Sequence, residues 1–270
     1  MMVVNAVSYG SAFRKASVQT VALARRSIIT EIRQLATVLP GFIFPLLLAA
    51  IYTHQFQPTL QLPGFPKVDS FLDFLLPAAI LQMVSFGSNA SGMELALDIE
   101  NGFMDRLLSS PVARVPVLIG RIAGSAILAI SKTLVMIFIF LLCGAGIAGG
   151  IRAVIILMLV AALLVVIIGG LSQILAIRTG SQEVVGATFP LVFVLIFMSS
   201  AFFPTSLMSG WFKVLAESNP ITWIIDPLRR LVIEGWSWSD AFSALLVSAV
   251  GAVLVTGLSV RSLYRSLARS

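Results

Sequence analysis

The sequence predicts an all-α membrane protein with six transmembrane helices, and two observations lead to that class. Charged residues make up 11% of the chain and hydrophobic residues 58%, with a mean hydropathy of +1.01. A soluble domain has about 25% charged residues, so a surface in contact with water would not be covered here. In addition, six long stretches carry almost no charge, and each is long enough for the ~20 apolar residues of a membrane-crossing helix. These stretches are residues 34–66, 74–93, 122–151, 153–177, 184–212 and 241–260.

The N-terminal segment, residues 11–33, mixes apolar and basic side chains. Val18, Val21 and Ile28 belong to an apolar stripe at roughly helical spacing, and most basic residues lie beside it, although Arg25 falls within it. This pattern is typical of a basic amphipathic helix that lies on the membrane surface. An irregular cytosolic tail is the alternative.

The spans follow in order along a single transmembrane domain, residues 1–270. Spans one and two are expected within 35–92, and spans three to five within 115–203. Span six is expected at 239–260, before a short basic tail at 261–270. Residues 204–237 contain three of the four tryptophans and are amphipathic. Such aromatic rings favour the headgroup zone, so we expect short helices that dip into the outer leaflet and return; a plain extracellular loop is the alternative.

The distribution of Lys and Arg predicts the orientation. Twelve basic residues fall in the N-terminal segment, the 93–121 segment, the link at 178–183 and the tail, whereas five fall in the intervening loops on the other side. Because positive residues stay on the cytoplasmic side, both termini are expected there, as in a multi-pass protein of the plasma (inner) membrane. The net charge of +6 is then explained by contacts with lipid headgroups, and we expect no nucleic-acid partner.

The sequence lacks the residues that several classes of chemistry require. The chain has no Gly-Lys pair and therefore no phosphate-binding loop for ATP. His54 is the only histidine and Cys143 the only cysteine, so we expect no metal or cofactor site and no intrachain disulfide. No serine has a base at a recognisable spacing, and we expect no catalytic site. Residues 1–33 also lack the uninterrupted apolar core of a cleavable signal peptide.

Lys132 is the sole candidate for a charge deep within a span. A charged residue inside the membrane is costly, and such residues often mark a transport path. The alternative is that its long stem carries the amine toward headgroups or a wet cavity. A carrier coupled to protons or sodium normally needs a buried carboxylate, and none is evident.

The segment 93–114 interrupts the apolar pattern between the second and third spans. Ser91 and Glu94 have the spacing of a capping box, which predicts a helix start, and Asn101-Gly102 predicts its end. Phe103 to Leu108 forms a second short piece, which Pro111 stops. Charged and apolar side chains alternate here, a mixture that suits docking against another protein. An ordinary solvated loop is the alternative.

Two motifs give this layout a family resemblance. Residues Glu100-Asn-Gly-Phe-Met-Asp-Arg-Leu-Leu-Ser-Ser-Pro-Val-Ala-Arg114 closely resemble the signature of type-2 ABC transporter permeases, especially the daunorubicin-resistance branch of drug and lipid exporters. Asn219-Pro-Ile-Thr-Trp-Ile-Ile-Asp-Pro-Leu-Arg229 resembles the family's outer re-entrant stretch. The family's longer extracellular domains are missing, as in its compact export type.

The resemblance implies a function and assigns roles to residues. The chain would be the permease subunit of an ATP-driven exporter of hydrophobic or amphiphilic substrate, paired with a second permease, identical or homologous. Two ABC ATPase subunits would hold ATP and magnesium. The ATPase-coupling residues would be Glu100, Gly102, Phe103, Asp105, Arg106, Leu107 and Pro111, and the outer motif Asn219, Pro220, Asp226 and Arg229. Rival readings are a polysaccharide-exporting permease, a stand-alone carrier or channel, and an intramembrane enzyme.

Overall fold

The computed structural model describes residues 29, 35–61, 63, 65–68, 70–102 and 114–267. Apart from Ile29, the expected interfacial helix at 11–33 lies outside the described residues. The same is true of residues 103–113, which include most of the predicted ATPase-coupling residues.

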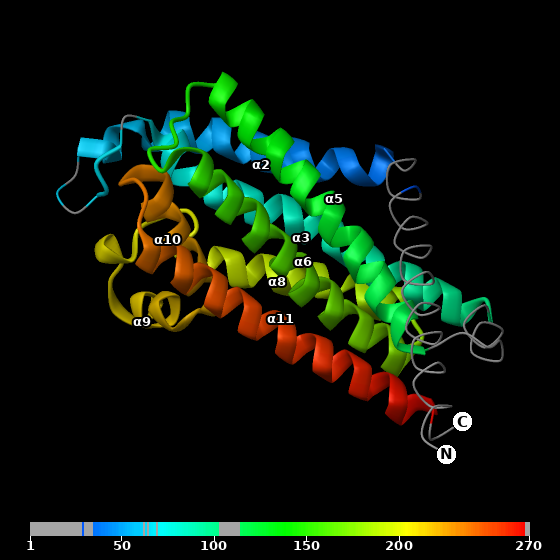
Figure 1. The fold of residues 1–270 in the computed structure, drawn as a ribbon. Helices are drawn as coiled ribbons and strands as arrows, with labels where there is room; N and C mark the ends of the chain where they lie inside the picture. The colour runs from blue at the N-terminus through cyan, green and yellow to red at the C-terminus, as the bar shows by residue number, and fades with distance from the viewer. Residues whose placement is uncertain are drawn as a thin grey trace, which may run out of the picture.

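The described residues form helices joined by short connections (Figure 1). The longer helices arise from the uncharged stretches of the sequence, and within the described part of the chain no strand occurs, as the all-α prediction requires. In chain order the elements are α2 (Leu35–Phe56), η1 (Gln57–Gln61), α3 (Phe71–Glu100), α5 (Arg114–Leu142), α6 (Gly150–Thr179), α7 (Gln182–Gly186), α8 (Thr188–Phe197), η2 (Thr205–Leu207), α9 (Gly210–Ser218), α10 (Pro220–Ile233) and α11 (Trp238–Leu267).

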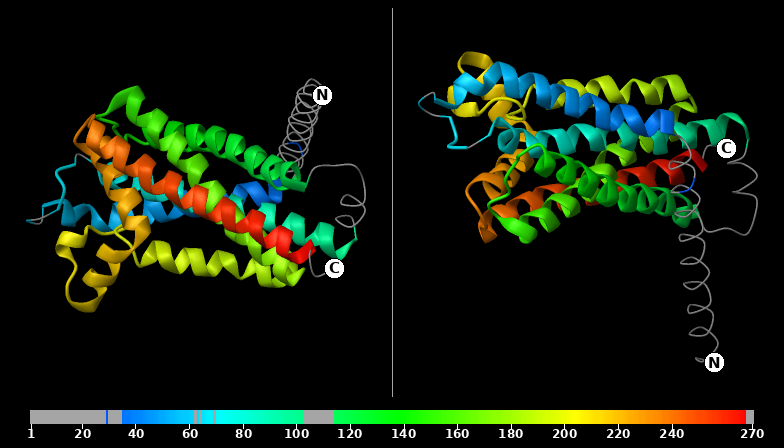
Figure 2. Two further views of the ribbon diagram at one scale, coloured as in Figure 1. Left: turned by 60° about the horizontal axis from the view of Figure 1, so that its bottom comes forward. Right: turned by 90° about the horizontal axis from the view of Figure 1, so that it is seen from above.

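The long helices run roughly side by side, so the molecule has two ends (Figures 1 and 2). One end carries α9, α10 and the α2–α3 and α5–α6 connections, and we call it the outer end after the orientation that the charges predict. The other end carries the last turns of α3, α6 and α11, together with α7, and we call it the inner end. Among the described site residues, Glu100 and Gly102 therefore lie at the inner end, and those of α10 and its cap lie at the outer end.

Among the described residues, five helices are long and apolar enough to cross a membrane: Val38–Gln61, Phe71–Glu100, Ala123–Leu142, Gly150–Thr179 and Trp238–Arg265. The chain is therefore an all-α, multi-pass membrane protein. The fifth predicted span, 184–203, differs, because helix there covers only Gln182–Phe197, about 24 Å at 1.5 Å per residue.

The short fifth helix is also broken, between α7 and α8. Pro190 has no N–H to give the carbonyl of Gly186, and its ring clashes with that carbonyl, so the helix is interrupted at Ala187. Beyond Phe197 the backbone leaves the helical conformation and turns toward α9 and α10. The outer part of this apolar stretch is thus irregular chain.

The centre of the bundle is α3, which packs against α2, α5, α6, α8 and α10. It runs without interruption from Phe71 to Glu100, so the helix start predicted from Ser91 and Glu94 is wrong. An N-cap needs extended backbone before the helix, whereas the apolar, proline-free sequence after Pro77 continues the helix through Ser91. The predicted end at Asn101-Gly102 is confirmed, since Gly102 has a φ of 64°.

One close helix crossing fixes α3 against α6. A Cβ built on Gly92 would lie 2.4 Å from the Cβ of Ser172 and 2.8 Å from its carbonyl carbon. Such small residues let helix backbones approach closely in membranes. Nearby, the Ser172 hydroxyl donates to Asn89 Oδ1 at 2.8 Å. The α3 and α6 helices are therefore held in close backbone contact at this crossing.

Candidate functional site

At the inner end, the last residue of α3 is joined to the start of α7. Glu100 Oε1 accepts the backbone N–H of Gln182 at 3.1 Å, and Glu100 Oε2 accepts from Gln182 Nε2 at 2.8 Å. The same turn of α7 begins at Ser181, whose hydroxyl oxygen lies 3.5 Å from the N–H of Val184. A displacement of the end of α3 would thus pull directly on the short fifth helix.

Gly102, two residues after Glu100, adopts the left-handed backbone conformation, with a φ of 64°. A Cβ added there would meet nothing within 4 Å. Glycine is required by conformation at this position and not by crowding. Of the predicted coupling residues, Glu100 and Gly102 are described. Phe103, Asp105, Arg106, Leu107 and Pro111 lie outside the described residues.

At the outer end, Asn219 both starts α10 and closes α8. Its Oδ1 accepts the N–H of Ile221 at 2.9 Å, which is an N-cap contact, and Pro220 follows in the first turn, where the missing N–H is not needed. Its Nδ2 donates to the carbonyls of Leu195 at 2.8 Å and Met198 at 3.1 Å. These are carbonyls that the end of α8 leaves without intrahelical donors.

Arg229 is the buried charge of the outer end, with 5% of its surface exposed. Its guanidinium donates to the carbonyls of Ser200 at 2.8 Å, Ala201 at 3.0 Å and Phe74 at 3.3 Å. It also pairs with Asp226 Oδ1 at 3.1 Å and lies 3.7 Å from the ring centroid of Phe74. Burial lowers its pKa to about 10, so it stays protonated at neutral pH.

Of the outer predicted residues, Asp226 and Arg229 are therefore brought into contact, whereas Asn219 and Pro220 lie at the start of α10, against the end of α8. Asp226 and Glu234 are both close enough in sequence to pair with Arg229, and the structure shows the pair with Asp226. Asp226 also accepts a hydrogen bond from the Ser200 hydroxyl, and Thr222 Oγ1 accepts from the N–H of Ser200 at 3.0 Å. Together these side chains hold the irregular chain after α8 against α10 and α3.

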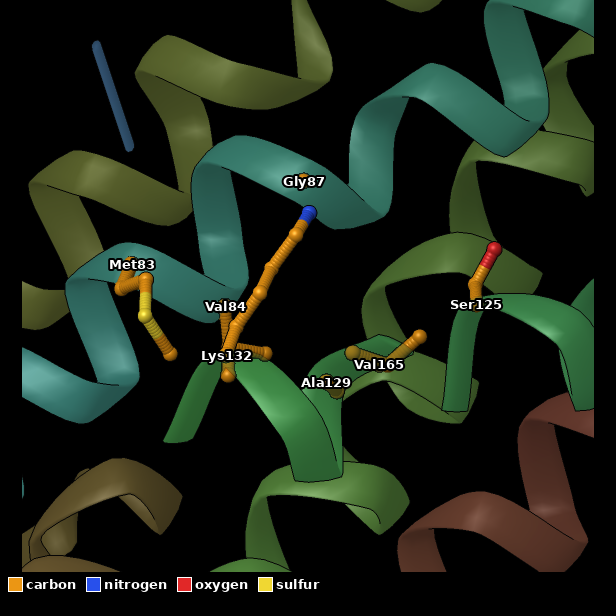
Figure 3. A pocket seen from close by; sticks show the side chains of 7 residues that line it. All are labelled: Met83, Val84, Gly87, Ser125, Ala129, Lys132 and Val165. Carbon is orange, nitrogen blue, oxygen red and sulfur yellow. The ribbon is translucent and has the colours of Figure 1, made fainter. Parts of the chain in front are cut away.

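Lys132 lies at mid-bundle on α5, far from both ends. Figure 3 shows its side chain extending toward Gly87 of α3, beside Val84. The two helices and α6 line a cavity of about 10 Å³ there, which also includes Ser125 and Val165. The amine thus faces the protein interior and not an end of the bundle.

A row of aromatic rings links α2, α3 and α8, and sequence reasoning missed it. Phe86 of α3 contacts Phe189 and Phe44, Phe44 contacts Phe193, and the contacts continue outward through α8. We call this row the aromatic seam; its rings are Phe44, Tyr52, Phe86, Phe189, Phe193, Phe197 and Phe202, with centroids of neighbouring pairs 4.6–5.6 Å apart. The spacing of phenylalanines 189, 193 and 197 on one helical face was the available signal.

Gln82 lies against this seam and was also missed. It is 1% exposed on α3, and its Nε2 has no hydrogen-bond partner. A buried donor without a partner costs about 1–3 kcal/mol. It shares a cavity of about 10 Å³ with Pro45, Tyr52 and Phe202.

The fold and these two ends define a class of protein, a helical membrane protein in which a central helix connects an inner contact to an outer polar cluster. The sequence profile of the ABC-2 type transporter family matches residues 18–233. This range covers more than half of the chain. The chain belongs to the ABC-2 type transporter family.

Named relatives are similar over most of their length. The daunorubicin resistance ABC transporter permease protein DrrB1 of Streptomyces coeruleorubidus is 26% identical over 83% of this chain and 78% of its own. The putative transport permease ycf38 of Cyanophora paradoxa is 26% identical, over 83% of this chain and 77% of its own. The probable doxorubicin resistance permease DrrC of Mycobacterium tuberculosis is 24% identical, over 92% and 88%.

Proposed function

We propose that this chain is the permease subunit of an ATP-driven exporter that moves hydrophobic or amphiphilic molecules, drugs or lipids, out of the cytoplasm or the inner leaflet. Two permease subunits would pair above two ABC ATPase subunits, which hold ATP and magnesium. Both termini would face the cytoplasm, in the plasma (inner) membrane. The names of the drug-resistance relatives support the substrate class.

The observation that carries the proposal is the contact of Glu100 with Gln182. A force applied by an ATPase to residues 100–111 would reach α7 through this contact and α3 through the continuous helix. Because α3 is packed against most other helices, its displacement would change the whole bundle. This is a route by which ATP binding biases an assembly with two states.

At the other end, α9 and α10 would dip into the outer leaflet and return. Trp211 and Trp223, both exposed, are amphipathic rings of the kind that favours headgroups. Asn219, Asp226 and Arg229 would hold this unit to α8 and α3, so that movement of the inner end is passed to the outer end. Lys132 would lie along the path between them.

The experiment is purification of the tagged chain in mild detergent, with mass spectrometry of the chains that accompany it. We expect an ABC ATPase in equal amount, ATP hydrolysis only when it is present, and export of daunorubicin from vesicles that depends on ATP. A Phe103/Asp105/Arg106 triple-alanine variant should lose both the complex and export. Export that needs an ion gradient and no ATP would instead support a stand-alone carrier. Export of a polysaccharide would support a polysaccharide-exporting permease.

A matched control is available on α11. Arg265 also carries charge at the inner end, but it lies on a different helix from Glu100. It is not part of residues 100–111, the proposed coupling segment. Arg265→Ala should therefore retain the complex. Loss of the complex in this variant as well would mean that the general positive charge of the inner end binds the ATPase, and that the coupling segment has no special role.

A further inference from the structure

The start of α6 carries a cation without an anionic partner. Arg152 lies in the first turn of this helix, where there is no acidic residue and no side-chain hydrogen bond at the cap. The first N–H groups of a helix lack intrahelical partners and give its start a partial positive charge. A guanidinium at this position adds to that charge, so an anion bound here would be stabilised by both.

Arg152 makes no hydrogen bond or ion pair within the part of the chain that the structure describes. Its guanidinium carbon lies over the ring of Trp236, 5.8 Å from the ring centroid. By contrast, Arg230 at the same end pairs with Asp240 at 2.6 Å. The positive charge of Arg152 is therefore held in place by an aromatic ring and is not neutralised by an acid.

The ring and the start of α6 are fixed relative to each other by backbone contacts just before each of them. The N–H of Ala148 donates to the carbonyl of Val232 at 2.7 Å, and the N–H of Gly149 to that of Leu231 at 3.1 Å. A Cβ on Gly149 would lie 2.5 Å from the Leu231 oxygen, so only glycine allows this approach. The cation and its ring thus belong to one rigid arrangement.

This arrangement leaves the hydrogen-bond donors of Arg152 available. The face of an aromatic ring attracts a cation without accepting its N–H groups as a carboxylate would. A planar guanidinium matches phosphate through two parallel N–H···O bonds, a geometry that a lysine amine does not offer. The most suitable ligand for this position is therefore a phosphate group.

The place of Arg152 along its helix indicates the source of that phosphate. α6 has 30 residues, a length of about 45 Å, whereas the hydrocarbon core of a membrane is ~30 Å thick. The first turn of α6 therefore lies at the level of the lipid headgroups. Trp238 at the start of α11 is 75% exposed, and its ring centroid is 5.1 Å from that of Trp236. Exposed indole rings favour the same level of the membrane.

We propose that Arg152 and the start of α6 bind the phosphate of one anionic phospholipid, such as phosphatidylglycerol, at the outer end of the protein. The guanidinium donates two hydrogen bonds to phosphate oxygens, and the start of the helix adds its partial positive charge. Trp236 holds the guanidinium in position, and Trp238 contacts the glycerol region of the lipid. The site is independent of the proposed function, since it needs neither an ATPase nor a substrate.

The test is a count of bound lipids by native mass spectrometry. The full-length chain, purified in an uncharged detergent and stripped of lipid, would be titrated with dioleoyl phosphatidylglycerol or with dioleoyl phosphatidylcholine, whose headgroup has no net charge. We expect the first phosphatidylglycerol to bind at a half-saturating concentration about fivefold lower than the first phosphatidylcholine. Equal concentrations for the two lipids would overturn the proposal.

Arg152→Gln removes the cation from an exposed position and should leave folding intact. We expect the half-saturating concentration of phosphatidylglycerol to rise about tenfold, as for loss of a charge-assisted hydrogen bond. Arg152→Lys should give an intermediate value, because it restores the charge without the planar fork. A wild-type value in Arg152→Lys would overturn the bidentate contact.

Lys213→Gln is the matched control, because it removes the same charge from α9 at the same end of the protein. It should leave the binding of the first phosphatidylglycerol unchanged. An equal rise in Lys213→Gln and Arg152→Gln would show that the general positive charge of the outer end attracts the lipid, and the site at Arg152 would be refuted.

Inorganic phosphate distinguishes a lipid headgroup from a free anion. Added in excess over the lipid, it should leave the bound phosphatidylglycerol in place, because the acyl chains of the lipid also contact the protein. Displacement of phosphatidylglycerol by inorganic phosphate would assign the site to the free anion and overturn the lipid proposal.

Discussion

Glu100 at the end of α3 accepts two hydrogen bonds from Gln182, one from its backbone and one from its side-chain amide. This contact joins the two polar segments of the inner end that the sequence separates by 82 positions. The first prediction tests it directly. Glu100→Ala and Gln182→Ala should each reduce ATP-dependent export, because either change disconnects α7 from the end of α3.

The two changes should not add, since they remove the same contact. The contact lies at the exposed surface, so thermal unfolding in detergent should stay unchanged. Export rates of the two single variants and the double variant form the measurement. Additive losses would show that Glu100 acts on something other than Gln182.

The second prediction concerns Arg229. Arg229→Met removes the donor of three carbonyl contacts and leaves Asp226 without its ion pair, so we expect a loss of about 3 kcal/mol in the free energy of unfolding. The control is the neighbouring pair Arg230–Asp240, at 2.6 Å, whose arginine is more exposed than Arg229. Arg230→Met should cost no more than about 1 kcal/mol. Equal losses, measured by denaturant or thermal unfolding, would contradict a special role for the buried residue.

A third prediction follows from the contact of Gly92 with Ser172. Gly92→Ala places a methyl group 2.4 Å from the Ser172 Cβ, and the α3–α6 pair must separate, at a cost of about 1–3 kcal/mol. Gly257→Ala on α11 meets nothing within 4 Å and should be neutral or slightly stabilising. If both variants unfold at the same temperature, the two helices are less tightly joined than described.

The fourth prediction concerns orientation. After Cys143→Ser removes the native thiol, a membrane-impermeant maleimide should label Lys67→Cys and Lys213→Cys from outside sealed cells. Arg106→Cys and Arg265→Cys should be labelled only after the membrane is opened. External labelling of the last two positions would reverse the orientation and place residues 100–111 on the wrong side for a cytoplasmic ATPase.

The sequence was sufficient for the class and for most helices, because uncharged stretches in lipid have few alternatives to helix. It was misleading at Ser91, where a capping pattern lies inside a continuous helix. The pattern indicates which side chain can cap a helix start. Whether a new helix starts at Ser91 was decided by the neighbouring apolar sequence, which continues α3 through this position. The break near Ala187 is explained by Pro190. The prediction of a span from its lack of charge did not take this proline into account.

Contacts between distant segments were beyond sequence reasoning. Arg229 had two possible acid partners, and only the fold shows that Asp226 lies on the side of the carbonyls of Ser200 and Ala201. The aromatic seam depends on how α2 and α8 lie across α3, which no local pattern specifies. The environment of Gln82 could not be predicted for the same reason, since its burial and its unpaired amide depend on packing by α2.

The irregular chain after α8 has a consequence for the hydration of the outer end. In a continuous helix, backbone polar groups are satisfied internally, and water can reach them only if the helix unwinds. Around Ser200, side chains of Thr222 and Arg229 supply those hydrogen bonds, and water molecules can replace them one at a time. The chain around Ser200 can therefore exchange these hydrogen bonds for water and re-form them without loss of secondary structure.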